Sequence, residues 1–128
     1  MKIIKKIKIK KVITPQTKNE LKEEYEFKIF KLEQECEQLR FEKKKMIQQN
    51  PAKQTDIIAK FEKEMNSRKD HMKWYQYKLQ QLNILPIGSE ILDGEADAIL
   101  EITEGMDWEE ITKERAILIE NGKVKKIT

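Results

Sequence analysis

The sequence predicts an α+β protein in which a long antiparallel coiled-coil hairpin is inserted in a small β domain built from both termini. Three patterns predict this class: apolar residues alternating with lysines at the start, heptads in the middle, and short alternating runs with turn signals near the end. Charged residues make up 38% of the 128 residues and aromatic residues only 7%. This composition favours long helices that bury a narrow apolar stripe.

The beginning of the chain predicts a β-strand over residues 1–13. Its odd positions are mostly apolar, and lysines fall between them. A period of two with β-branched residues indicates a strand with one basic, solvated face. Lys5 and Lys11 interrupt the alternation, so we expect this strand at a sheet edge, where lysines also guard against aggregation.

The first helix of the arm follows Thr14-Pro15, because the residue before a proline is disfavoured in helical geometry. Thr17 and Glu20 fit a capping box at the start of a helix that reaches about Gln49. Apolar residues then recur with heptad spacing, as in a coiled-coil seam. The seam positions are Tyr25, Ile29, Leu32, Cys36, Leu39 and Met46, with Lys43 as the polar exception.

A second helix is expected from about Thr55 to Asn83, after the break at Asn50-Pro51. Its seam positions are Ile58, Phe61, Met65, Arg68, Met72, Tyr75, Leu79 and Leu82, of which only Arg68 is polar. Because the link between the helices is short, they must run antiparallel. Residues 15–83 therefore form a coiled-coil arm about 40–50 Å long.

The C-terminal part contains signals for strands and turns. Residues 85–88 (LPIG) break the helix, and Asp93-Gly94 is a turn signal. Alternating runs follow at residues 95–103, 116–120 and 123–127. Asn121-Gly122 predicts a two-residue hairpin turn that pairs Glu120 with Lys123 and Ile119 with Val124. Residues 107–113 fit either a helical turn or a short strand.

The two ends of the chain carry opposite charge. Residues 1–14 contain six lysines and no acidic residue, whereas residues 84–128 contain five basic and eleven acidic residues. An antiparallel arm returns the chain to its starting point, so the basic first strand should lie against the acidic C-terminal strands. Residues 1–14 and 84–128 therefore form one small β domain, since neither part has enough strands to be stable alone.

The sequence contains no catalytic motif, and we expect no catalytic residue, metal site, cofactor or small-molecule substrate. His71 is the only histidine, and its place beside the seam favours a solvated residue over a ligand. Cys36 falls on the seam and fits a buried apolar role. Trp108 fits a core anchor of the β domain. One cysteine and no run of about 20 apolar residues indicate a cytoplasmic protein without a membrane partner.

Two groups of residues on the arm are candidate contact sites. Basic residues cluster near the tip and could contact RNA or another anionic partner, although a lysine run is also typical of a solvated helix face: Arg40, Lys43, Lys44, Lys45 and Lys53. Four aromatic residues lie off the seam at one height, on opposite sides of the hairpin, and predict one contact with the β domain and one with a second copy of the chain in a homo-oligomer: Phe27, Phe30, Trp74 and Tyr77.

Four stretches of the chain resemble the YlqD family of Firmicutes: residues 32–39 (LEQECEQL), 41–45 (FEKKK), 81–90 (QLNILPIGSE) and 119–124 (IENGKV). The resemblance runs through nearly the whole chain, and its most distinctive part is the link at residues 84–90. It implies no enzymatic activity and no catalytic residues. Because members tend to be encoded near genes for ribosomal proteins and ribosomal RNA maturation, it implies a role around ribosome biogenesis.

These observations together predict a non-catalytic interaction protein that serves as an accessory factor in ribosome biogenesis or RNA handling, with RNA or a ribosomal particle as partner. The alternative is a structural or chaperone-like module that grips a protein with the coiled-coil arm. The basic arm tip argues against the chemistry of transcript-cleavage factors, which needs acidic residues at that place.

Overall fold

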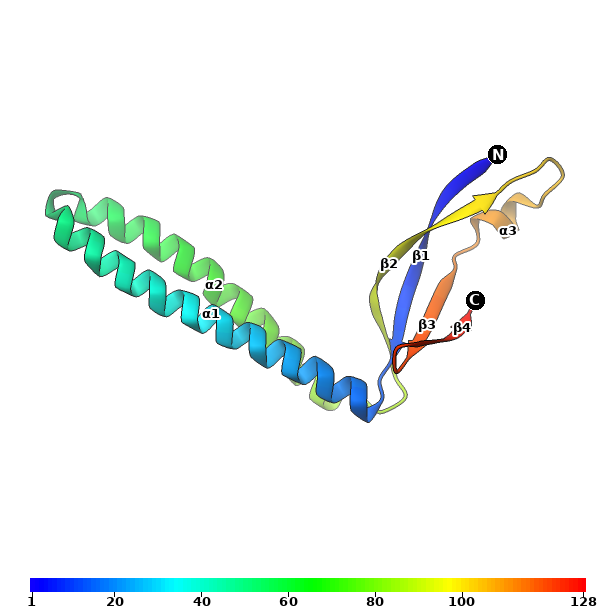
Figure 1. Ribbon diagram of the computed structural model, residues 1–128, viewed down its shortest axis with the longest axis horizontal. Coiled ribbons are helices and arrows are strands. Elements are labelled where there is room, and N and C mark those ends of the chain that lie inside the picture. The colour runs from blue at the N-terminus through cyan, green and yellow to red at the C-terminus, as the bar shows by residue number, and fades with distance from the viewer. The chain divides into compact units, whose positions relative to one another are not determined.

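The computed structural model describes residues 1–128, which form a mixed β-sheet and a long helical hairpin (Figure 1). The elements are β1 (Lys2–Val12), α1 (Pro15–Gln49), the 3-10 helix η1 (Pro51–Lys53), α2 (Gln54–Ile84), β2 (Glu90–Glu101), α3 (Trp108–Thr112), β3 (Ala116–Glu120) and β4 (Lys123–Ile127). The helices α1 and α2 are inserted between β1 and β2, which confirms the predicted fold class.

The chain divides into two compact units. Residues 1–18 and 85–128 form the sheet unit, and residues 19–84 form the arm. The four strands of the sheet unit have the order β2-β1-β3-β4. β1 pairs antiparallel with β2 over its whole length and parallel with β3, and β3 pairs antiparallel with β4. Both ends of the chain therefore build a single sheet.

The expectation that the first strand lies at an edge is wrong for Lys8–Lys11, which pair with β3 on one side and β2 on the other, whereas Lys2–Ile7 pair with β2 alone. Three lysines of β1 pair with carboxylates on neighbouring segments. Lys11 lies 3.3 Å from Asp93 and Lys6 lies 4.0 Å from Glu95. Lys8 forms an ion pair with Glu114, just before β3. The opposite charges of the two termini are thus paired within the sheet.

The predicted turn at Asp93-Gly94 is also wrong, since both residues lie inside β2. Ile9 is opposite Gly94, and the next residue of β1, Lys10, is opposite Leu92. Asp93 is therefore the extra residue of a β-bulge. The long ladder with β1 overrides the local turn preference, and the surplus residue is absorbed without ending the strand.

Helix α1 begins at Pro15, two residues before the expected cap. The Thr14 hydroxyl oxygen accepts a hydrogen bond from the Thr17 amide at 3.1 Å, so Thr14 and not Thr17 is the N-cap. Proline fits the first helical position because it lacks an amide that would need a partner. The Thr14 hydroxyl also donates to Asn121 Oδ1 at 2.7 Å, which ties the start of the helix to the β3–β4 turn.

The β3–β4 hairpin has the predicted register. Asn121 and Gly122 adopt positive φ values of 50° and 78°, as a two-residue turn of this type requires. Ile119 pairs with Val124 and Glu120 with Lys123, as expected from the sequence. The register shifts between Leu118 and Ile119, where Lys125 is the extra residue of β4, and Lys125 lies 3.1 Å from the Glu120 carboxylate.

The arm is held together along the predicted seam, since every expected seam position is buried or half-buried. The tightest packing lies toward the α1–α2 link, where Leu39, Ile57, Phe61 and Met65 form a buried cluster. Ile57 is more deeply buried there than the expected Ile58. Neither long helix has a stretch apolar enough to cross a membrane.

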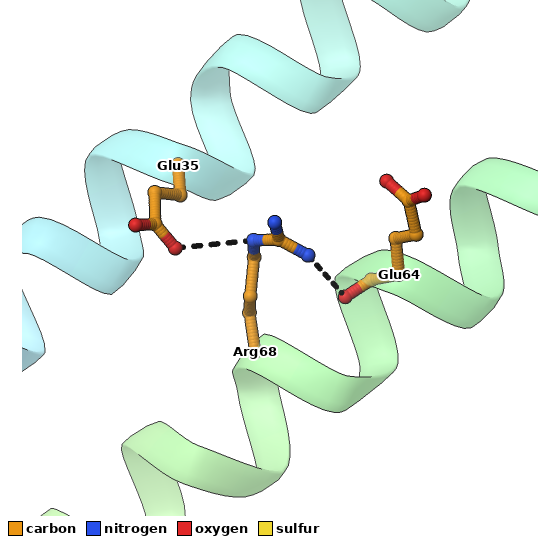
Figure 2. Close-up of polar contacts among 3 residues, drawn as sticks. All are labelled: Glu35, Glu64 and Arg68. Carbon is orange, nitrogen blue, oxygen red and sulfur yellow. Dashed lines mark hydrogen bonds and ion pairs between the residues drawn. The ribbon is translucent and has the colours of Figure 1, made fainter.

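Arg68 is the polar seam residue of α2, and its guanidinium lies between Glu35 of α1 and the Glu64 backbone of α2 (Figure 2). Its Nε donates to the Glu35 carboxylate on α1 at 3.1 Å, and a terminal nitrogen donates to the Glu64 carbonyl oxygen at 3.1 Å. The charge is therefore compensated by hydrogen bonds in the half-exposed flank of the hairpin.

Candidate functional site

A shallow groove between α1 and α2 gathers basic side chains in the distal part of the arm. We call it the distal groove; it encloses about 430 Å³ and is lined by Arg40, Lys43, Lys44, Glu62, Met65, Asn66 and Lys69. Its floor includes Met65, which belongs to the buried cluster of the seam. The walls come from residues one helical turn apart, because side chains at i and i+3 or i+4 share a helix face. The packing of the seam thus positions the groove.

The cations around the distal groove are mostly without an acidic partner in the chain. Arg40 forms an ion pair with Glu37 on its own helix. The side chains of Lys44 and Lys45 are exposed and form no ion pair or hydrogen bond within the chain, and the same holds for Lys53 beyond the groove. Ammonium and guanidinium donors beside an Asn amide suit phosphate or carboxylate oxygens.

The arm changes charge along its length. Its distal half, residues 40–69, contains nine basic and four acidic residues, whereas its proximal half, residues 19–39 and 70–84, contains five basic and eight acidic residues. An anionic partner is therefore attracted to the distal half and repelled by the proximal half. Attraction of this kind acts over roughly a Debye length, about 10 Å at 0.1 M salt.

The structure brings together only part of the predicted basic cluster. Arg40, Lys43 and Lys44 line the distal groove, whereas Lys45 and Lys53 do not. Lys43 is half-buried at the seam. The sequence reasoning missed Asn66 and Lys69, which α2 contributes to the same groove. The antiparallel register could have found them, because residues whose numbers add to about 105 lie at one height in this hairpin.

The four off-seam aromatic residues are exposed on the arm. Phe27, Phe30, Trp74 and Tyr77 are 60%, 53%, 52% and 57% exposed. Phe30 lies in a groove with Cys36 and Met72, while Trp74 lies in another groove with Leu32 and His71. The two grooves have no residue in common, so these two aromatic rings face different flanks of the hairpin.

Lysines cover two of these rings without burying them. Lys31 Nζ lies 5.7 Å from the centre of the Phe27 ring, and Lys78 Nζ lies 5.1 Å from that of Trp74. Such cation–π contacts contribute roughly 0.5–1 kcal/mol at exposed sites. Each of these exposed apolar rings is therefore bordered by a positive charge.

Three other residues were considered as functional candidates from the sequence: Trp108, His71 and Cys36. Trp108 is 63% exposed, so its predicted role as a core anchor is wrong. The Asp107 carboxylate accepts the Glu109 amide at 3.0 Å and caps α3, which turns Ile111 inward instead. His71 is exposed and Cys36 is buried. No three His, Cys, Asp or Glu side chains gather as metal ligands.

Two ionisable groups of the sheet unit have displaced pKa values. The hydrogen bond and the charge of Glu114 raise the pKa of Lys8, and the same contact with Lys8 lowers the pKa of Glu114. Both side chains are solvent-exposed, so this pair joins β1 to the segment before β3 and is not an acid–base couple in a pocket.

The protein is thus of the α+β class, with a mixed sheet built from both termini and an inserted helical arm that bears a basic groove. The chain belongs to the YlqD family, whose family model, described as YlqD protein, matches residues 1–128. It is 38% identical over 129 residues to the uncharacterised protein YlqD of Bacillus subtilis (strain 168), covering 99% of this chain and 98% of that relative. The match confirms the family resemblance inferred from the sequence.

The fold also occurs in a more distant solved structure. A crystal structure of a protein of unknown function from Synechococcus sp. WH 8102 superposes with a TM-score of 0.86 at 18% identity. The match covers 100% of this chain and 94% of that one. At this identity the likeness establishes a common fold.

Proposed function

We propose that this protein is a non-catalytic factor that binds RNA through the distal groove, as an accessory factor in cytoplasmic ribosome biogenesis or RNA handling. The observation that carries the proposal is the set of basic side chains around the groove, several of them without an acidic partner in the chain. A cation that pairs inside a protein is already neutralised, whereas an unpaired one is free to meet a phosphate.

The chemistry of the groove suits a phosphate backbone. Arg40 offers a planar guanidinium, while Lys44 and Lys69 offer point charges on flexible stems. Phosphate contacts position a nucleic acid without reading its sequence. The groove has no aromatic lining residue on which a base could stack, which favours recognition of backbone and shape.

The test is RNA binding by a variant with fewer distal cations. Lys44→Gln/Lys69→Gln removes two positive charges at the groove, and Lys22→Gln/Lys73→Gln removes two exposed lysines from the proximal half as a matched control. Binding is measured by fluorescence polarisation with labelled ribosomal RNA fragments and by cosedimentation with ribosomal subunits.

The distal variant should bind at least about 10-fold more weakly, and the control should bind like the wild type. Wild-type affinity should fall steeply with salt, with a log–log slope smaller by about 1–2 in the distal variant because fewer counterions are released. Equal effects of both variants would contradict the groove as the site. If polyglutamate competes as well as unlabelled RNA, the partner of the groove is an acidic protein and not RNA.

The exposed aromatic residues favour a second candidate function, a protein-binding or structural module in which the arm associates with a second arm. Trp74 and Tyr77 are more than half exposed, and exposed aromatic pairs are typical of contact surfaces. Trp74→Glu/Tyr77→Glu should lower the mass measured by light scattering, whereas Gln76→Glu/Gln80→Glu adds the same charge and should not. A mass unchanged in both variants would refute association through this surface.

A further inference from the structure

The register of the sheet separates its side chains into two unlike faces. On one face, lysines of β1 stand opposite carboxylates of β2, as in Lys2 with Glu101 and Lys6 with Asp97. On the other face, Ile7 stands opposite Ala96, and Ile9 stands beside Ile117. Lys5 and Lys11 are the charged residues of β1 on this face. Ile117 is in turn opposite Ile127. We call this second surface the apolar sheet face.

The apolar sheet face is covered only in part, and its most exposed side chains are on β4. Val124 and Ile127 are 61% and 69% exposed, and Ile9 and Ile117 are only half-buried. A helix covers one end alone: Lys5 donates to the Ile111 carbonyl oxygen at 2.6 Å and also to that of Lys113, next to α3. A four-stranded sheet normally buries one face against another layer, and here the apolar side chains of β4 lie outside any such layer.

We propose that a second copy of this chain covers the apolar sheet face, with the two sheets packed face to face about a two-fold axis that runs parallel to the strands. The partner is identified by the charges on the two edges of the sheet. β2 carries five acidic residues and no basic one, and β4 carries three lysines and no acidic residue. A two-fold axis along the strands places the β2 edge of each copy over the β4 edge of the other.

The alternative axis, perpendicular to the strands, places β2 over β2 and β4 over β4. Like charges then face one another at both edges, which disfavours that arrangement. Most of these charged side chains lie on the charged face of the sheet, away from the interface. They therefore influence the orientation of the two copies, and the isoleucines of the apolar sheet face supply the affinity. Aligned packing of two such sheets leaves about 10 Å between them, which the interdigitating side chains fill.

The size of the face fits a reversible dimer. Strands about 4.8 Å apart that rise about 3.3 Å per residue give a flat footprint on the order of 500 Å² per copy, and α3 occupies one end of it. A dimer of two copies thus buries roughly 600–1,000 Å² of flat surface, and the uneven surface of the side chains adds to this area. Such an area is at the low end for specific interfaces. We therefore expect a dissociation constant of about 1–100 μM, which makes the dimer concentration-dependent.

The test uses two isoleucines with nearly equal exposure on opposite faces. Ile127 on β4 lies on the apolar sheet face, and Ile4 on β1 lies on the charged face with an exposure of 73%. Each has one lysine next to it in the chain, Lys126 or Lys5, so Ile127→Glu and Ile4→Glu introduce the same group at exposed strand positions on opposite faces. Both side chains are exposed in the single chain, so neither change should unfold it; circular dichroism checks this.

Sedimentation equilibrium of the full chain, from about 1 μM to about 1 mM, should show a mass rising from 15.3 kDa toward twice that value. Ile127→Glu should keep the mass at that of the single chain and raise the dissociation constant at least about 30-fold, whereas Ile4→Glu should change it less than about 3-fold. A wild type that stays single at the highest concentration, or equal effects of the two variants, would overturn the proposal.

A second pair of substitutions tests how the two copies are oriented in the dimer. Lys123→Glu/Lys126→Glu puts negative charge on the β4 edge, which in the proposed dimer faces the acidic β2 edge, so association should weaken and raising the salt from about 0.05 M to about 0.5 M should restore it. If these substitutions strengthen the dimer, the perpendicular axis is correct and the charge argument for the proposed orientation is refuted. The arm variants at Trp74 and Tyr77 separate this interface from association through the arm.

Discussion

Replacing Phe61 with Ala should destabilise the arm more than any other single truncation of a phenylalanine. Phe61 is 6% exposed and belongs to the cluster that holds α1 and α2 together near their link. The hairpin has one narrow seam and no second layer, so neighbouring side chains have little freedom to close the space that the ring leaves. The truncation therefore combines lost burial with a residual cavity.

The magnitude follows from the area. A phenylalanine that is nearly fully buried removes about 150 Å² more apolar surface from water than alanine would, which at about 25 cal/mol per Å² is roughly 3–4 kcal/mol. With the cavity included, the loss should be about 3–5 kcal/mol. Because the seam is the arm's only core, Phe61→Leu is a second variant that keeps the arm folded and should cost about 1 kcal/mol.

The matched control is Phe41, which lies on the same arm and is 64% exposed. Phe41→Ala should cost less than about 1 kcal/mol, because most of its ring is already in water. Urea unfolding followed by circular dichroism at the helical band gives the free energies of all three variants. Equal losses for Phe61→Ala and Phe41→Ala, or a larger loss for Phe41→Ala, would refute the assignment of the seam.

Four further outcomes are expected. Arg68→Leu should leave the free energy of unfolding unchanged or raise it by up to about 1 kcal/mol, because an apolar residue replaces an ion pair at a seam position; a clear loss in urea unfolding would contradict this. Thr14→Val should cost about 1 kcal/mol through loss of the α1 cap, measured by thermal unfolding against Thr112→Val. Gly122→Ala should cost about 1 kcal/mol because φ is 78° there, and unchanged amide protection in β4 would disprove it. Since Lys8 lowers the pKa of Glu114, their pair should stabilise the sheet unit above the ordinary carboxyl pKa and lose this effect as the pH falls through the lowered value; Glu114→Gln should remove that part of the pH dependence.

The arm was predictable because its signals are local. Heptad spacing decides which side of a helix is apolar, and two such helices on a short link have one way to meet. Every expected seam position is accordingly buried or half-buried. The β3–β4 hairpin was predictable for the same reason, since Asn121-Gly122 selects the turn and the turn selects the register.

The candidate site was predictable only in part. The lysine run marked Arg40, Lys43 and Lys44, but membership of the distal groove depends on which residues of α2 lie across from them. Asn66 and Lys69 stand in a sequence that looks like any solvated helix face. Their contribution appears only when the antiparallel packing brings them opposite α1.

The sequence by itself determined the strand and helix periods, the turn at Asn121-Gly122 and the opposite charges of the two termini, because each depends on neighbours along the chain. Only the tertiary structure decided that the second half of β1 is interior to the sheet, that Asp93 is a bulge and not a turn, and that Ile111 rather than Trp108 is buried. These outcomes depend on pairing between segments about 80 to 110 residues apart. Over such separations the summed hydrogen bonds and ion pairs of a long ladder outweigh the preference of any single dipeptide.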